Sequence, residues 1–167
     1  SDWERLRDRV AAGGRGDAWL RIGLLKGFVD GSLGSKTALF DDPYPGSGDD
    51  RGLAVTTPEQ LRTWVTGADH ASLHVAVHAI GDRANRETLN IFEAAFKANP
   101  DKKDLRWRVE HAQHLHASDI PRFGQLGVIA SMEGVHCTSD APYVLARLGA
   151  QRAEEGAYVW QKLLKSG

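Results

Sequence analysis

Residues 73–96, LHVAVHAIGDRANRETLNIFEAAF, decide the fold because an alternating apolar run is followed at once by an amphipathic helical pattern. In the run, Val75 and Val77 point to one side and His78 to the other, as the two-residue period of a strand requires. Gly81 ends the run, and Asp82 is expected to cap a helix whose apolar residues recur at helical spacing. His78 is therefore predicted at the carboxyl end of a strand, where α/β folds hold their chemistry.

The rest of the chain repeats this alternation of strands and helices. Further strands are predicted at residues 19–30, 105–111 and 128–132, and helices at residues 2–12, 57–68, 118–126, 142–148 and 155–164. Loops rich in small and polar residues are predicted at 31–37 and 40–52, and a further loop at 133–140. Strands that are separated by helices pair in parallel with right-handed crossovers, so the sequence predicts an α/β fold.

Composition limits the partners and the compartment. The 21 basic and 22 acidic residues nearly cancel, which argues against a nucleic-acid partner. Cys137 is the single cysteine, so an internal disulfide framework and a CxxC zinc site are excluded. No apolar run reaches the roughly 20 residues that span a bilayer, and we expect no membrane association. The chain begins with Ser1 rather than methionine, which indicates processing or a longer parent protein; we expect a cytoplasmic location, and export of the parent stays open.

Three of the predicted strands carry a potential metal ligand near the carboxyl end. Lys26, His78 and His111 each lie near the carboxyl end of a strand, and in a parallel sheet these ends meet at one edge. Alternation puts His111 on the apolar side of its strand, with Val109. Neutral imidazole is a metal ligand, whereas a lysine joins a metal site only when its amine is deprotonated or carboxylated. Two plainer explanations are open for Lys26, an ion pair with Asp30 or an escape to solvent, because burying an unpaired ammonium is costly.

Other charged residues in these strands are expected to be structural. His70, His74 and His78 are spaced four apart, as on one face of a metal-binding helix, but the valines between them favour a strand. His70 and His74 are therefore predicted to be ordinary structural residues. Arg108 and Glu110 lie on the polar side of the 105–111 strand, where we expect them to form an ion pair because a covered strand is otherwise mostly apolar.

Four motifs, in order along the chain, resemble those of one enzyme group. They are KGFVDGSLGSKTA from Lys26, VHAIGDRAN from Val77, RVEHAQ from Arg108 and SMEGVHCTSD from Ser131. Together they resemble the amidohydrolase superfamily, and more narrowly the amidohydrolase family 3 branch that includes N-substituted formamide deformylases. The resemblance implies a partial (β/α)8 TIM barrel of about four parallel βα units, equal to strands 4 to 7. Residues 1–167 would then be the central part of a hydrolase whose first strands, β-sandwich segments and eighth strand lie elsewhere.

The resemblance also implies roles for individual residues. His78 and His111 match the histidine ligands of the fifth and sixth barrel strands, and Lys26 matches the fourth-strand position where a carboxylated lysine bridges two metals. The implied cofactor is one or two divalent ions, zinc being the expected metal. Three further residues would line the substrate pocket: Asp30, His136 and Asp140. Where the family usually has Gln-Pro, this sequence has Glu133 and Gly134.

The implied reaction is hydrolysis of a carbon–nitrogen bond in a small amide- or formamide-type substrate by metal-activated water. The catalytic aspartate would come from the eighth strand, so no catalytic residue is assigned within this chain and the isolated piece is expected to be inactive. Two other interpretations are open. One is a non-catalytic α/β ligand-binding or structural module with structural histidines. The other is a homo-oligomer that forms through the exposed edges of the sheet.

Overall fold

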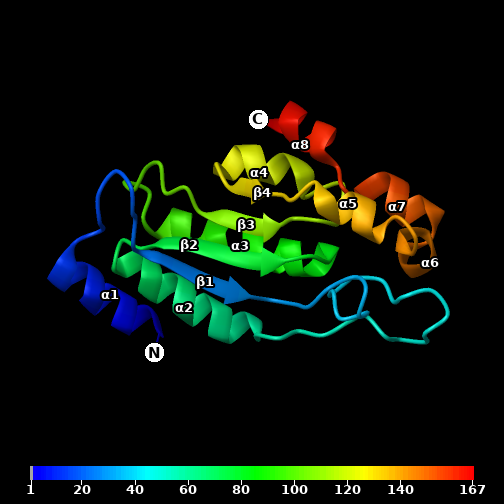
Figure 1. Cartoon of the computed structure of the whole chain (residues 1–167), viewed down its shortest axis with the longest axis horizontal. Helices are drawn as coiled ribbons and strands as arrows, with labels where there is room; N and C mark the ends of the chain where they lie inside the picture. Colours follow the sequence, from blue (N-terminus) through cyan, green and yellow to red (C-terminus); the bar gives the residue numbers. More distant parts are fainter. Residues whose placement is uncertain (1) are drawn as a thin grey trace.

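The computed structural model describes residues 2–167 and has one parallel sheet with helices between its strands (Figure 1). The strands pair in chain order and are β1 (Leu24–Phe28), β2 (His74–Ala79), β3 (Arg108–His111) and β4 (Ile129–Ser131). The helices are α1 (Asp2–Gly13), α2 (Pro58–His70), α3 (Asp82–Ala98), α4 (Ile120–Leu126), α5 (Val135–Asp140), α6 (Val144–Leu148), α7 (Ala150–Gly156) and α8 (Trp160–Ser166). Each pairing is parallel, which confirms the predicted α/β class. Across residues 2–167 no helix combines the length and apolarity that crossing a membrane requires.

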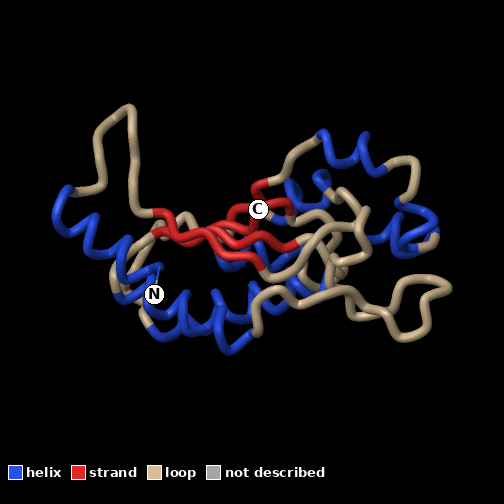
Figure 2. The backbone as a smooth tube through the Cα atoms, turned by 60° about the horizontal axis from the view of Figure 1, so that its bottom comes forward, coloured by secondary structure: helices blue, strands red, loops and turns tan. Residues whose placement is uncertain are grey.

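One face of the sheet is covered by helices and forms the main core. Val75 and Val77 of β2 and Val109 of β3 are at most 1% exposed and belong to one apolar cluster with residues of α2, α3 and α4. Trp107, just before β3, meets the ring of Phe92 on α3 with the centroids 5.1 Å apart. Figure 2 shows helices layered along one side of the strands. The buried valines are those that the alternating pattern assigned to a single side.

The opposite face of the sheet is open. Leu24 and Phe28 of β1 are 42% and 49% exposed, and Ile129 of β4 is 44% exposed. The in-register pairing puts Glu110 on the same face as Phe28. There Glu110 forms the expected ion pair with Arg108, with 2.5 Å between Nε and Oε1. A sheet face that leaves large apolar side chains exposed is the arrangement expected for part of a barrel.

Local chemistry sets the starts of the two long helices. Thr57 caps α2, because its hydroxyl accepts from the Gln60 amide while the Gln60 side chain accepts from the Thr57 amide. The prediction for α3 was wrong by one residue, since Gly81 is the N-cap and Asp82 is already helical. The Asp82 carboxylate instead accepts a hydrogen bond of 2.9 Å from the backbone amide of Asp41. This bond fastens the long loop after β1 to the start of α3.

The first strand is shorter than the predicted 19–30. Asp17 Oδ1 accepts hydrogen bonds of 2.7 and 3.0 Å from the amides of Trp19 and Leu20, and Gly16 forms an isolated bridge with Arg21. These contacts make a tight turn that leaves Trp19 96% exposed. A side chain that binds the backbone in this way competes with strand pairing, so β1 begins only at Leu24.

The segment after β4 is more helical than predicted. Residues 133–140, expected to be a loop, contain α5, and the helix expected at 155–164 is split into α7 and α8. The split comes from backbone pairing, because the Leu115 amide donates to Gly156 O and the Tyr158 amide donates to Gln113 O, each at 2.9 Å. Tyr158 also has a φ of 52°, which a continuous helix does not allow. The pairing ties α7 to the chain that follows β3.

A second, smaller core lies beyond the carboxyl ends of the strands. It joins the loop after β1 to α6 and α7, and consists of Leu33, Ala38, Phe40, Tyr44, Ile80 and Leu148. Arg152 of α7 lies over the Phe40 ring, 4.8 Å from its centroid, and donates to Pro43 O at 3.0 Å. In Figure 1 the strand arrows point toward this region. The carboxyl edge of the sheet, where the predicted site lies, is therefore supported by this second core. We call this edge the rim.

Candidate metal centre

Lys26 lies on the open face of β1. Its side chain is exposed, and its Nζ is 4.3 Å from the centroid of the Phe28 ring. Partial burial lowers the pKa of Lys26, while the nearby carboxylates of Glu110 and Glu133 act in the opposite direction. Of the two plain explanations for this lysine, escape to solvent is the one observed, because the Asp30 carboxylate is occupied by backbone amides.

His78 is the penultimate residue of β2 and is half-buried. Its Nε2 is 2.8 Å from the carbonyl oxygen of Gly31 and 3.5 Å from Asp30 Oδ1. Burial, assisted by the charges of His111 and Lys26, lowers the pKa of His78, which favours the neutral imidazole near pH 7. When Nε2 carries the proton and donates to the carbonyl, Nδ1 keeps its lone pair. Metal-binding histidines are commonly oriented by a hydrogen bond of this kind.

His111 ends β3 and departs from strand alternation. Its φ is 73°, and that of the following Ala112 is 43°, both in the left-handed region that non-glycine residues rarely adopt. The sequence placed His111 on the apolar side with Val109, but its ring meets that of His78 edge-on, with the centroids 4.6 Å apart. The backbone turn thus brings the two imidazoles together at the rim.

A carboxylate and a third imidazole complete the cluster around His111. Glu133 follows β4, and His136 lies in the first turn of α5. His111 Nδ1 is 2.9 Å from Glu133 Oε2 and 3.2 Å from His136 Nε2, and the latter two atoms are 3.5 Å apart. The loop predicted at 133–140 is instead helical from Val135, which turns the His136 ring toward His111.

These three separations fit a common cation. Ligand atoms around a tetrahedral ion with bonds of roughly 2.0–2.1 Å lie about 3.4 Å from one another. His111, Glu133 and His136 each offer one ligand atom, and all three atoms lie within 4.8 Å of one another. Imidazole nitrogen and carboxylate oxygen are also the donor types that divalent transition metals prefer. The chemistry and spacing of the donors therefore fit a divalent metal, without selecting among such metals.

Asp30 is buried behind His78 and is held by the backbone. Its side chain accepts hydrogen bonds from the amides of Leu39, Ile80 and Gly81 at 2.8, 3.0 and 2.8 Å. Burial raises the pKa of Asp30 to about 7, although each of these amides acts to lower it. Asp30 thus lies beside the histidine cluster, but its carboxylate is engaged in joining three backbone segments.

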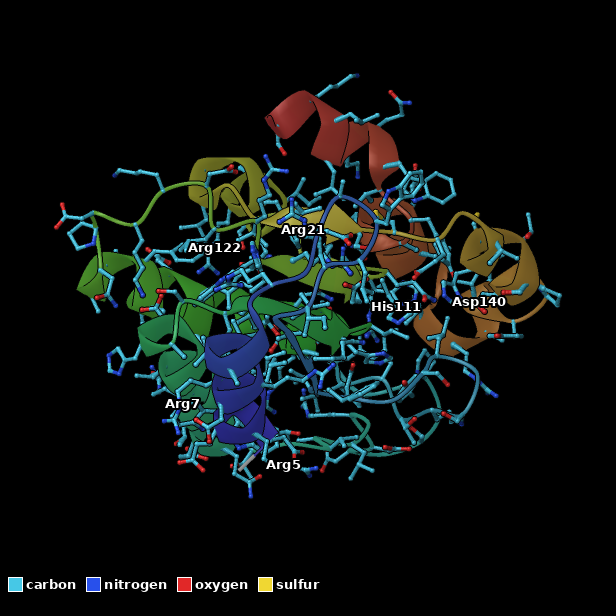
Figure 3. All side chains as sticks on the ribbon, turned by 60° about the vertical axis from the view of Figure 1, so that its left-hand side comes forward. Arg5, Arg7, Arg21, His111, Arg122 and Asp140 are labelled. Atoms are coloured by element: carbon cyan, nitrogen blue, oxygen red, sulfur yellow. The ribbon has the colours of Figure 1, made fainter. Side chains whose placement is uncertain are left out.

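Asp140, the last residue of α5, lies in a separate polar network. Its carboxylate accepts hydrogen bonds from the Tyr158 hydroxyl at 2.6 Å, from the Tyr143 hydroxyl and from Gln113 Nε2. Burial acts to raise the pKa of Asp140, but these hydrogen bonds outweigh burial and the pKa is lowered. Figure 3 labels His111 and Asp140 at the same end of the molecule. Asp140 therefore fastens α5, the helix that carries His136, to the chain after β3.

Sequence reasoning missed the buried part of this network. Gln113 and His114 are each 2% exposed, and burial lowers the pKa of His114 to about 3. Gln113 Oε1 and His114 Nδ1 are buried without a hydrogen-bond partner among the described residues. The motif RVEHAQ contains Gln113, but nothing in its pattern distinguishes a buried amide from an exposed one.

The structure brings together most of the predicted site. His78 and His111 are in ring contact, His136 joins His111, and Asp30 lies behind His78. Lys26 is on the same open side of the sheet, with its ammonium over Phe28 rather than against the imidazoles. Asp140 belongs to the neighbouring network described above. The functional roles assigned to all six residues stay predictions.

Comparisons with known proteins identify the family of this chain. A model of the amidohydrolase family matches residues 1–167. The chain is 44% identical over 163 residues to the protein LONG AFTER FAR-RED 3 of Arabidopsis thaliana, covering 97% of this chain and 28% of that protein. It is 34% identical over 149 residues to YtcJ of Bacillus subtilis strain 168, covering 89% of this chain and 27% of YtcJ. The chain therefore spans between a quarter and a third of the length of these two curated relatives.

A solved structure shares the fold. The crystal structure of an uncharacterized metal-dependent hydrolase from Pyrococcus furiosus superimposes with a TM-score of 0.80 at 32% sequence identity. The match covers 96% of this chain and 33% of that chain. The four parallel strands and their helices thus correspond to one part of a larger, barrel-like fold, as the family resemblance implied.

Proposed function

The chain belongs to the amidohydrolase family, and from this we propose that it is the central part of a metal-dependent enzyme that hydrolyses a carbon–nitrogen bond in a small amide- or formamide-type substrate. Family membership supports hydrolysis with a metal as the general chemistry. The carbon–nitrogen bond, the substrate class and the position of the chain within its parent are the proposed parts.

One observation carries the proposal: the rings of His78 and His111 converge with their centroids 4.6 Å apart at the carboxyl ends of neighbouring parallel strands. In barrel enzymes this edge of the sheet holds the active site. A non-catalytic module has no need for a residue such as His111 to adopt a φ of 73° in order to reach a second imidazole. The convergence therefore favours a binding centre over two separate structural histidines.

The proposed ligands are His78, His111 and Lys26. The depressed pKa of His78 keeps its imidazole neutral, as metal binding requires, and the lowered pKa of Lys26 favours the neutral amine from which a carboxylated lysine forms. A bound divalent ion, for which we propose zinc, supplies an acidified water and polarises the substrate carbonyl. Carboxylation would turn the Lys26 cation into an anion and so release its contact with the Phe28 ring.

Three residues are proposed to shape the substrate pocket beside these ligands. His136 presents a ring whose side chain is 33% exposed, so it is available to a substrate at the rim. Asp30 and Asp140 use their carboxylates within the protein, and we assign them to holding the pocket walls in place. The proposal places the aspartate that transfers the proton outside residues 1–167, and it names no general base within this chain.

The test is a hydrolysis assay on the intact parent protein with a simple N-formyl amine. Hydrolysis is expected to stop after chelation, to return with added divalent metal, and to fall by at least about 100-fold in His78→Ala and His111→Ala. His70→Ala, which removes an exposed histidine at the far end of α2, is the matched control and should keep full activity. Hydrolysis that is unchanged in both rim variants would contradict the proposal.

A further inference from the structure

We propose that His111, Glu133 and His136 form a divalent-cation site of their own, beside the proposed hydrolytic centre. The inference deepens the proposed function, because both sites use His111; a neutral imidazole has one lone pair on nitrogen, so His111 ligates one of the two ions at a time. The site otherwise rests on Glu133 and His136, and it does not require that the protein hydrolyse an amide. Its ligands come from the ends of β3 and β4 and from α5, rather than from β1 and β2.

The three ligand atoms are close enough together to coordinate one cation. Pairs of atoms among His111 Nδ1, Glu133 Oε2 and His136 Nε2 are 2.9, 3.2 and 3.5 Å apart. Each of these atoms has a lone pair when the imidazoles are neutral and the carboxylate is ionised. A proton on His111 Nδ1 can form a well-aligned hydrogen bond with only one of the other two atoms. A cation between the three atoms can be coordinated by all of them. A close triangle of acceptor atoms is therefore better explained by a cation than by a hydrogen bond alone.

The charge and type of the donors also suit a divalent cation. Two imidazoles and one glutamate form a ligand set used by zinc enzymes, in which the fourth position stays open. Glu133 contributes the negative charge of the ligand set. Its side chain is 44% exposed, and that of His136 is 33% exposed, so a hydrated ion can reach both from solvent. The Glu133 carboxylate thus adds a negative charge to the pair of imidazoles, which favours a cation.

The surrounding structure holds two of the three ligands in place. His136 is held by α5, and α5 is fastened at its last residue by the hydrogen bonds that Asp140 receives from Tyr143, Tyr158 and Gln113. His111 is directed by a left-handed backbone, with φ of 73°. Two of the three ligands therefore have fixed backbones before any ion arrives, which reduces the entropy cost of binding.

The experiment measures Zn²⁺ binding to the full chain by competition with a chromophoric chelator. Glu133→Gln keeps the shape of the side chain and removes its charge, and it should weaken one Zn²⁺ site by about 100-fold or more, as should His136→Gln. Glu154→Gln removes an equivalent charge from an exposed position on α7 and should leave binding unchanged. His78→Gln should retain this site, because His78 is not among its ligands.

A second readout separates a ligand from a merely structural residue. Two-bond ¹H–¹⁵N spectra report which nitrogen of each imidazole is bound, and on Zn²⁺ addition they should show Nδ1 of His111 and Nε2 of His136 as the ligated atoms. Binding that is lost in His78→Gln but unchanged in Glu133→Gln would overturn this inference and leave the proposed function standing. If Glu133→Gln loses Zn²⁺ binding while the parent protein shows no hydrolytic activity, this site is supported and the proposed function is wrong.

Discussion

Asp30 and Gly81, 51 residues apart in the sequence, are joined by a hydrogen bond of 2.8 Å from the Gly81 amide to Asp30 Oδ2. The same oxygen accepts from Leu39, and Oδ1 accepts from Ile80. One carboxylate thus fixes the loop after β1 against the end of β2, directly behind His78. The position of the candidate centre depends on this junction.

Asp30→Asn is expected to lower the free energy of unfolding by about 1–3 kcal/mol. Each carboxylate oxygen accepts at least one backbone N–H, so an asparagine NH₂ group must face one donor and leave it unsatisfied. Urea unfolding measures the change, and Asp42→Asn, at an exposed position of the same loop, is the control. If both variants unfold like the wild type, Asp30 does not join these segments in solution.

Gly81→Ala tests the same junction from its other side. A Cβ at Gly81 would lie 2.0 Å from the Leu39 carbonyl oxygen, so the backbones must separate. We expect a loss of at least about 2 kcal/mol in the free energy of unfolding. Gly13→Ala, where a Cβ meets nothing within 4 Å, should change stability little by comparison. Equal stability of the two variants would show that the loop is not held this closely.

The Asp140 network should control the order of α5. In Asp140→Ala the hydroxyls of Tyr143 and Tyr158 and the Gln113 amide lose their shared acceptor, so α5 is released from the chain after β3. Amide hydrogen exchange in Val135–Asp140 should become faster by about 10-fold or more, while exchange in β2 stays the same. Tyr158→Phe removes one donor and should have a smaller effect of the same kind. Unchanged exchange in both variants would exclude this role for Asp140.

His114 should make stability depend on pH in the acid range. Burial lowers the folded-state pKa of His114 to about 3, against an ordinary value of 6.5. Between those pH values the unfolded chain binds the additional proton, so the free energy of unfolding should fall on acidification by up to about 1.4 kcal/mol per pH unit. Above pH 6.5 the effect is absent. Urea unfolding of the wild type and of His114→Gln from pH 7 to pH 4 checks this. The free energy of unfolding should depend less steeply on pH in the variant than in the wild type. If the two proteins show the same dependence on pH, His114 is not the group responsible.

Periodic apolar patterns predicted most of the architecture. Val75, Val77 and Val109 are buried on one side of the sheet, and α2 begins within one residue of the predicted helix at 57–68, because apolar periodicity is a local signal. The turn made by Asp17 and the split between α7 and α8 were not predictable in this way. They depend on hydrogen bonds between particular side chains or distant backbone groups.

The candidate site was predictable only in part, for a similar reason. Strand ends indicated that Lys26, His78 and His111 share an edge, since parallel strands align their carboxyl ends. The left-handed φ of His111 cannot be read from alternation, and it is this turn that brings the ring to His78. The contact of Glu133 with His111 spans 22 residues and depends on how β4 passes into α5, so sequence spacing carried no signal for it.

We propose above that the rim formed by His78 and His111 holds a divalent metal in a hydrolase. Its most direct test is the metal content of the purified intact parent protein, measured by mass spectrometry for the wild type, His78→Ala, His111→Ala and the control His70→Ala. We expect stoichiometric divalent metal in the wild type and the control, with a loss of bound metal in both rim variants. A wild-type protein without bound metal that still hydrolyses its substrate, or rim variants that keep the full metal content, would contradict it.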